Sequence, residues 1–167
     1  MVSIIGLFSC SNGIEGEVKE NTQIFDHEIL NPKIIISNTT SKVIEATSKY
    51  LHKNNEDDAI LYGDVETHFF NEKNEHISIL TADTAKINEL NNNFNAIGNV
   101  IVVSDSGLTL KTKTLYWDHQ YKLVISNDSV EFTTREKDTL YGVGFESDMD
   151  LDQWRISRPF GIARVGI

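Results

Sequence analysis

Apolar and polar side chains alternate along most of the chain after residue 24. Between residues 59 and 69 the odd-numbered positions are mainly apolar and the even-numbered ones mainly polar, and residues 94–102 repeat the alternation. Successive side chains of a β-strand point to opposite faces, so this pattern is typical of antiparallel strands with one face on a core. Residues 83–90 fit either a helical or a strand period, and we interpret them as strand.

Further strands are predicted beyond residue 107. One begins at Leu108 and Leu110, after which its apolar positions shift to Leu115 and Trp117. The apolar positions of the next two strands are Tyr121, Leu123 and Ile125, and then Val130 and Phe132. Polar clusters that predict turns separate the runs at 71–75, 91–93, 105–107, 118–120 and 127–128.

Three glycines lie within or at the ends of predicted strands, at Gly63, Gly98 and Gly142. Glycine inside a strand usually marks a bulge, a bend or the close approach of another backbone. We expect all three to be structural, because strands that coil into a rolled sheet need such positions.

Length, composition and charge limit the kinds of molecule that the protein could bind. A length of 167 residues suits one domain with a real core. The net charge of -10 and the lack of a basic cluster argue against nucleic acid, because phosphate binding needs grouped Lys and Arg. An anionic lipid would therefore have to be bound through its acyl chains.

The first ten residues resemble a bacterial lipoprotein signal, in which Leu7, Phe8, Ser9 and Cys10 form the lipobox. This predicts a signal segment at 1–9, a lipidated tether at 10–23 with acyl chains on Cys10, and a β domain at 24–167. No Lys or Arg precedes the apolar run, which is also near the lower length limit of such signals. A free cysteine in a frayed terminus is the alternative.

Residues with catalytic or metal-binding chemistry are scattered. The five histidines lack the spacing of zinc ligands. Asp148, Asp150 and Asp152 alternate like calcium ligands, but Gln153 and Pro159 stand where a calcium loop needs Gly and Glu, so a strand with a polar face is expected. We find neither a nucleophile elbow nor a phosphate loop. The sequence predicts no enzyme, no cofactor and no metal.

The inward side chains of such a sheet either form a closed core or line a slot between two layers. A slot would hold lipid chains through burial of roughly 0.8 kcal/mol per methylene. The predicted inward, lipid-binding residues are Ile44, Leu61, Val65, Phe69, Ile79, Val100, Val102, Leu110, Ile125, Phe132 and Phe145.

From about residue 32 to 156 the chain resembles the LptC family, the periplasmic component of the lipopolysaccharide-export ABC transporter. The resemblance is carried by ordered segments at 44–46, 65–69, 80–87, 98–100, 110–118, 126–130 and 140–146. Gly142 matches a family glycine near the delivery end. The resemblance implies an all-β fold, a twisted, partly open antiparallel β-jellyroll of roughly fifteen strands.

The resemblance also implies a function. Lipopolysaccharide would be received from inner-membrane ABC transporter permeases and passed to a periplasmic LptA-like bridge protein by edge-strand pairing. The chain would lie in the periplasm, lipid-anchored to the inner membrane. Two alternatives remain: a structural or interaction lipoprotein with a closed β-sandwich core and no ligand, and another carrier of the same pathway without the anchor.

Overall fold

The computed structural model describes residues 27–53 and 58–161, which form one antiparallel sheet of eleven strands and no helix. This confirms the all-β, partly open prediction. The strands are β1 (His27–Leu30), β2 (Lys33–Ser37), β3 (Lys42–Thr47), β4 (Tyr50–Lys53), β5 (Asp58–Phe70), β6 (His76–Asn88), β7 (Phe94–Ser104), β8 (Thr109–Asp118), β9 (Leu123–Thr133), β10 (Thr139–Ser147) and β11 (Trp154–Phe160). The predicted segments 1–9 and 10–23, Cys10 and residues 24–26 lie outside the described residues.

Every long strand is bent at a corner that runs across the sheet. β1 and β2 are the two halves of one bent strand, and so are β3 and β4, because β1 pairs with β4 while β2 pairs with β3. Backbone hydrogen bonds line this corner: Asn31 N donates to Lys49 O, and Lys49 N donates to Gly63 O, both at 2.8 Å.

In the later strands a shift of register marks the corner. Such shifts lie between Tyr62 and Val65, Thr81 and Thr84, Ile97 and Val100, Thr112 and Tyr116, and Val143 and Phe145. Gly63 and Gly98 occupy it with φ of 75° and 80°, each followed by a residue of positive φ. Glycine adopts this conformation without a Cβ clash, so both glycines lie at bulges, one of the features expected of a glycine inside a strand.

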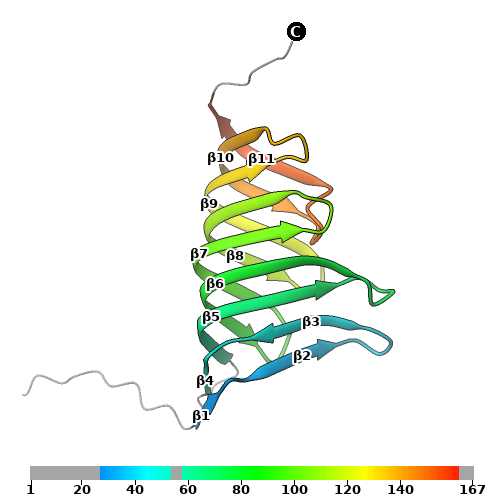
Figure 1. Ribbon diagram of the computed structural model, residues 1–167, viewed down its shortest axis with the longest axis vertical. Helices are drawn as coiled ribbons and strands as arrows, with labels where there is room; N and C mark the ends of the chain where they lie inside the picture. Colours follow the sequence, from blue (N-terminus) through cyan, green and yellow to red (C-terminus); the bar gives the residue numbers. More distant parts are fainter. Residues whose placement is uncertain (1–26, 54–57, 162–167) are drawn as a thin grey trace, which may run out of the picture.

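The corner folds the sheet into two facing layers with the core between them, and Figure 1 shows the bent strands stacked from β1 at one end to β11 at the other. The first layer contains β1, β4 and residues 58–62, 84–88, 94–97, 114–118, 123–126 and 145–147; the second contains β2, β3 and residues 65–70, 76–81, 100–104, 109–112, 129–133 and 139–143. The described strands number eleven rather than about fifteen, because pairing from β5 onward continues through the corner and each bent strand counts once.

Most of the residues predicted to face inward do so, and they are part of the core. Nine predicted residues are at most 1% exposed: Ile44, Leu61, Val65, Phe69, Val100, Val102, Leu110, Phe132 and Phe145. The prediction that Ile79 and Ile125 face inward is wrong. Both are half-buried on the outer face, while their neighbours Ser78 and Ser126 are buried.

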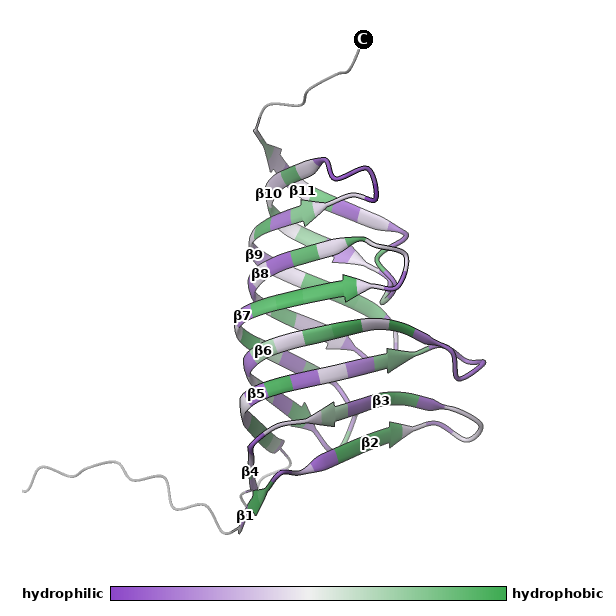
Figure 2. Cartoon of the chain, in the orientation of Figure 1, coloured by the Kyte–Doolittle hydropathy of each residue, from purple (hydrophilic) through white to green (hydrophobic). Residues whose placement is uncertain are grey.

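Hydrogen bonding explains these two exceptions. Ser78 Oγ donates to Met149 O at 2.9 Å, and Ser126 Oγ lies 2.8 Å from Thr112 Oγ1. A buried hydroxyl with a partner is tolerated, so serine takes the inward position and isoleucine the outer one. Ile79 pairs there with the exposed Val103 of β7, a strand that Figure 2 shows as apolar along its front.

Three local predictions also need correction. Residues 127–128 lie inside β9 at the corner and do not form a turn. Tyr121 is exposed in the turn before β9. The Asp148–Asp152 segment is a loop rather than a strand, because Leu151 has a φ of 63°, which breaks an extended conformation. Residues 83–88 are strand, as interpreted, and Leu90 lies in the following turn.

Candidate functional site

The middle of the interior is a packed core. Phe132 contacts Phe145 and Trp154, with ring centroids 5.3 and 4.6 Å apart, and Phe69 contacts Phe94 at 6.1 Å. The nine inward residues that the sequence identified belong to one hydrophobic cluster, which also contains Phe94. The interior therefore holds no continuous slot in this conformation, and openings are found towards its margins.

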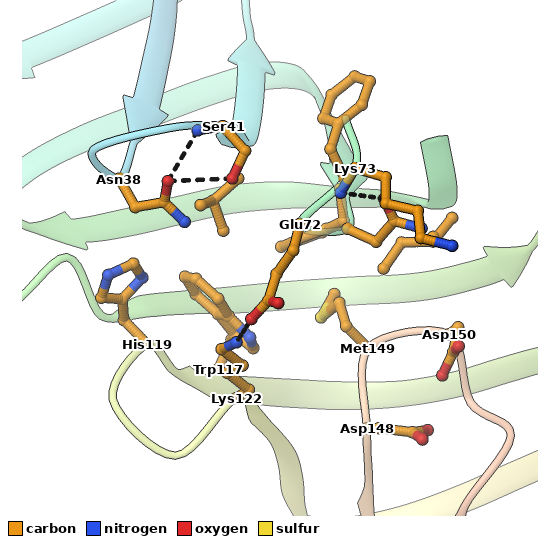
Figure 3. Close-up of a pocket in the computed structure, with 15 residues that line it drawn as sticks. Asn38, Ser41, Glu72, Lys73, Trp117, His119, Lys122, Asp148, Met149 and Asp150 are labelled. Atoms are coloured by element: carbon orange, nitrogen blue, oxygen red, sulfur yellow. Dashed lines mark hydrogen bonds and ion pairs between the residues drawn. The ribbon is translucent and has the colours of Figure 1, made fainter. Parts of the chain in front are cut away.

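A cavity of about 610 Å³ lies where the turns of the two layers face each other, on the side opposite the corner. We call it the mouth cavity. Its residues are Asn38, Ser41, Val43, Phe69, Phe70, Asn71, Glu72, Lys73, Ile77, Trp117, His119, Lys122, Asp148, Met149 and Asp150. Figure 3 shows the Glu72 side chain reaching to Lys122, with which it forms an ion pair. Of the predicted lipid-binding residues, Phe69 is the one that lines it.

Three contacts tie the margins of the two layers together, and we call this line the seam. Lys122 donates to Glu72 and lowers the pKa of that carboxyl, chiefly through the hydrogen bond. Arg135 pairs with Asp152, and Ser78 Oγ donates to Met149 O. Both ion pairs are exposed, so each contributes little to the stability of the closed seam.

The loop of residues 148–153, here called the plug loop, inserts between the layers. Leu151 is fully buried and Met149 is 8% exposed. Asp148 Oδ1 accepts a hydrogen bond from Gln153 N at 3.1 Å. Burial, followed by the hydrogen bond and negative charge of Asp148, raises the pKa of Asp150. The plug loop thus places apolar groups inside and carboxylates beside the mouth cavity.

Two residues that line the mouth cavity carry a buried polar atom without a hydrogen-bond partner among the described residues. These atoms are Trp117 Nε1 and His119 Nδ1. The two rings lie 5.2 Å apart at an interplanar angle of 78°. An unsatisfied buried polar atom destabilises a fold by about 1–3 kcal/mol.

A second opening lies at the β11 end of the molecule. It has a volume of about 730 Å³ and is lined by Thr139, Leu140, Tyr141, Trp154, Ile156, Pro159, Phe160 and Gly161. We call it the end hollow. Phe132, whose ring contacts Trp154, lies in the core beside it. The two openings are therefore separated by the packed aromatic core.

The close approach predicted at Gly142 is also present. A Cβ added there would lie 2.1 Å from Ile156 Cγ2 and 2.9 Å from Arg158 O. Gly142 therefore allows β11 to pack onto β10 beside the end hollow.

The β5–β6 hairpin brings together a polar chain that sequence spacing did not reveal. His68 Nε2 lies 2.9 Å from Glu66 Oε1, His68 Nδ1 lies 3.0 Å from His76 Nε2, and His76 Nδ1 lies 2.8 Å from Asp105 Oδ2. The two histidines are eight positions apart, and only strand pairing makes them neighbours. Within residues 27–53 and 58–161, no three His, Cys, Asp or Glu side chains form a group that could hold a metal.

Residues 38–153 match the family of OstA-like proteins, which is well over half of the chain. The chain belongs to the OstA-like family. This family is associated with lipopolysaccharide and organic-solvent transport in the periplasm and is not an enzyme family. No curated protein matches the chain. None of the described residues forms a helix with the length and apolar character needed to cross a bilayer.

Proposed function

We propose that this OstA-like protein is a periplasmic lipopolysaccharide-transfer protein of the LptC type. It receives lipopolysaccharide from the permeases of an inner-membrane ABC transporter and passes it to an LptA-like bridge protein. The observation that carries the proposal is an apolar interior between two layers, with an opening at the mouth cavity and another at the end hollow, in a chain of the OstA-like family.

Transfer requires the two layers to separate along the seam. The two exposed ion pairs oppose this only weakly, because solvent screens them. Burial of acyl chains returns roughly 0.8 kcal/mol per methylene, so a chain of ten carbons offsets the ion pairs and part of the lost core packing. The acyl chains then contact the inward residues Ile44, Leu61, Val65, Phe69, Val100, Val102, Leu110, Phe132 and Phe145.

Hand-over uses the unpaired edges of the sheet. Among the described strands, β11 pairs only with β10, and β1 and β2 have one partner each. An exposed strand edge presents backbone donors and acceptors to a strand of another protein. We assign delivery to the β11 edge, which borders the end hollow, and reception from the transporter to the β1–β2 end.

The proposed function includes a lipid anchor at Cys10. Acyl chains on Cys10 would hold the protein at the periplasmic face of the inner membrane, since two or more chains anchor stably where one does not. Mass spectrometry of the protein from cell membranes tests this, with Cys10→Ser as the control. An unmodified thiol at Cys10 would show that the protein carries no lipid anchor at this residue.

Site-specific photo-crosslinking tests the transfer function. Benzoylphenylalanine replaces Phe69 or Phe132 in cells, and Ile79 carries the same probe as the matched control, because it is apolar but lies on the outer face. We expect lipopolysaccharide adducts from the two interior positions and far fewer from Ile79. Equal labelling at all three positions would contradict an interior path.

The packed aromatic core supports a second candidate, a structural or interaction protein without a ligand. A dry core at native density binds no lipid. The two functions are separated by purifying the protein without detergent and identifying bound lipid. Lipopolysaccharide in the purified sample supports transfer, and a lipid-free sample with no interior crosslinks supports the second candidate.

A further inference from the structure

We infer that His68 and His76 form a binding site for a divalent transition metal ion on the outer face of the second layer. The ion takes one ring nitrogen from each histidine and completes its coordination with water. The inference goes beyond the proposed function and does not rest on it, because the site lies outside the apolar interior.

Strand pairing brings the two rings together. His68 lies in β5 and His76 begins β6, and a register shift after Phe69 pairs His76 with Phe70. The two ring centroids are 5.2 Å apart. The side chains of His68 and His76 are 29% and 28% exposed, so a metal ion and its water ligands can reach them.

Two carboxylates decide which ring nitrogens carry a proton. Glu66 Oε1 lies 2.9 Å from His68 Nε2, and Asp105 Oδ2 lies 2.8 Å from His76 Nδ1. An ionised carboxylate only accepts hydrogen bonds, so both of these nitrogens donate. In neutral rings, His68 Nδ1 and His76 Nε2 are then both acceptors, and they face each other at 3.0 Å. Two acceptors at this distance need a cation between them.

The separation of the two facing nitrogens is that of two ligands of one metal ion. Metal–nitrogen bonds of about 2.0–2.1 Å at a right angle place the nitrogens about 2.8–3.0 Å apart, and a tetrahedral angle places them about 3.3–3.4 Å apart. The observed 3.0 Å therefore favours the right-angled coordination of Cu(II) or Ni(II) over tetrahedral zinc. A carboxylate on the far nitrogen of each ring is also the usual outer shell of a metal-binding histidine, because it orients the ring and raises its basicity.

The charges around the two rings favour a cation. Glu66 and Asp105 each place a carboxylate beside one ring. On the adjacent strand β3, Glu45 pairs with the ammonium groups of Lys33 and Lys42. Three carboxylates thus surround the site with two ammonium groups, and the carboxylates nearest the rings are the two without an ammonium partner in these contacts.

Calorimetry with Cu(II) and Ni(II) tests the site. Full-length protein with Cys10→Ser is used throughout, so that a thiolate does not bind the metal. We expect a saturable site that binds Cu(II) more tightly than Ni(II) or Zn(II) and does not bind Mg(II), which prefers oxygen ligands. His68→Gln and His76→Gln should each weaken binding by at least about tenfold. His52→Gln, at a histidine of the first layer whose Nε2 lies 2.7 Å from Tyr62 Oη, is the matched control and should leave binding unchanged.

Two further measurements separate a metal site from a shared proton. Electron paramagnetic resonance of the Cu(II) form should show coupling to two imidazole nitrogens, and to one in His76→Gln. Glu66→Gln keeps a hydrogen-bond acceptor but removes the charge, and it should weaken Cu(II) binding by about tenfold without changing the circular dichroism of the protein.

Failure of both Cu(II) and Ni(II) to bind would overturn the inference and indicate that the two rings share only a proton. Equal binding by the unsubstituted chain and by His68→Gln and His76→Gln would overturn it as well. Neither result affects lipopolysaccharide crosslinking from Phe69, which tests the proposed function separately.

Discussion

At the scale of single residues, Leu151 holds the plug loop in place against its own backbone preference. Its φ of 63° lies in the left-handed region, where a side chain destabilises the backbone by about 1–3 kcal/mol. Complete burial of the leucine between the layers offsets this. The hydrophobic contact, more than the exposed ion pairs, therefore keeps the seam closed.

Leu151→Ala should lower the free energy of unfolding by about 2–5 kcal/mol, because it removes buried apolar atoms and leaves a cavity. Leu90→Ala is the matched control: the same substitution at a turn leucine that is 76% exposed should change stability by less than about 0.5 kcal/mol. Urea denaturation followed by circular dichroism measures both. Similar losses in the two variants would show that the plug loop does not stabilise the closed form.

Glu45 makes the stability of the protein depend on pH. Hydrogen bonds from Lys33 and Lys42, with Nζ–Oε distances of 2.7 and 2.9 Å, lower the pKa of this carboxyl from 4.5 to about 2. The pKa is lower in the folded state than in the unfolded one. The stabilisation is therefore present above pH 4.5 and is lost as the pH falls from 4.5 towards 2.

Glu45→Gln should lower stability at neutral pH, and its difference from the unsubstituted protein should shrink as the pH falls through this window. Thermal unfolding from pH 7 to pH 2 measures the effect. Glu136→Gln, at an exposed position of the β9–β10 turn, controls for the change in net charge. A constant difference between Glu45→Gln and the unsubstituted protein at all pH values would contradict the assignment.

At the scale of elements, β11 is the strand that depends most on one residue. The Cβ of an alanine at position 142 would overlap Ile156 Cγ2 and crowd Arg158 O. We expect Gly142→Ala to loosen the pairing of β10 with β11 and to destabilise the protein by about 1–3 kcal/mol. Hydrogen exchange should accelerate selectively at residues 154–160.

Ile156→Ala removes the closest clashing atom and supplies the control. The double variant should be more stable than the sum of the two single effects predicts, because the single variants share one contact. Strictly additive effects, or exchange that accelerates equally in β5–β6 and β11, would contradict a local clash at Gly142.

The strands can be predicted from the local alternation of apolar and polar residues. β5 and β7 alternate as the side-chain period of two requires, and their core residues Leu61, Phe69 and Val102 were identifiable without a structure. The pattern places the first half of β9 one residue out of phase, because Leu123 and Ile125 are apolar on the outer face, whereas Phe132 in its second half is predicted correctly. The hydrogen bond that turns Ser126 inward joins it to Thr112, fourteen positions away, and no local pattern contains it.

At the scale of the whole molecule, the corner and the seam define how a carrier of this shape can work. At the corner the backbone itself connects the two layers, and hydrogen bonds at Asn31, Lys49 and Gly63 reinforce it, so it acts as the fixed side. The seam consists of side-chain contacts and the plug loop, and it is the side that can part. In the proposed transfer function, acyl chains would enter between the layers from the seam while the corner stays intact.

The alternation of apolar and polar residues by itself determined that this protein is an antiparallel β-sheet and which side chains form most of its core, because strand geometry is a local property with a period of two. Tertiary structure alone decided the mouth cavity. Its walls come from segments as far apart in the sequence as Asn38, Glu72, Trp117 and Met149. Which turns meet depends on how the corner folds the sheet, and which donors remain unpaired depends on that meeting. Both depend on contacts between distant segments, which form only when the two layers face each other.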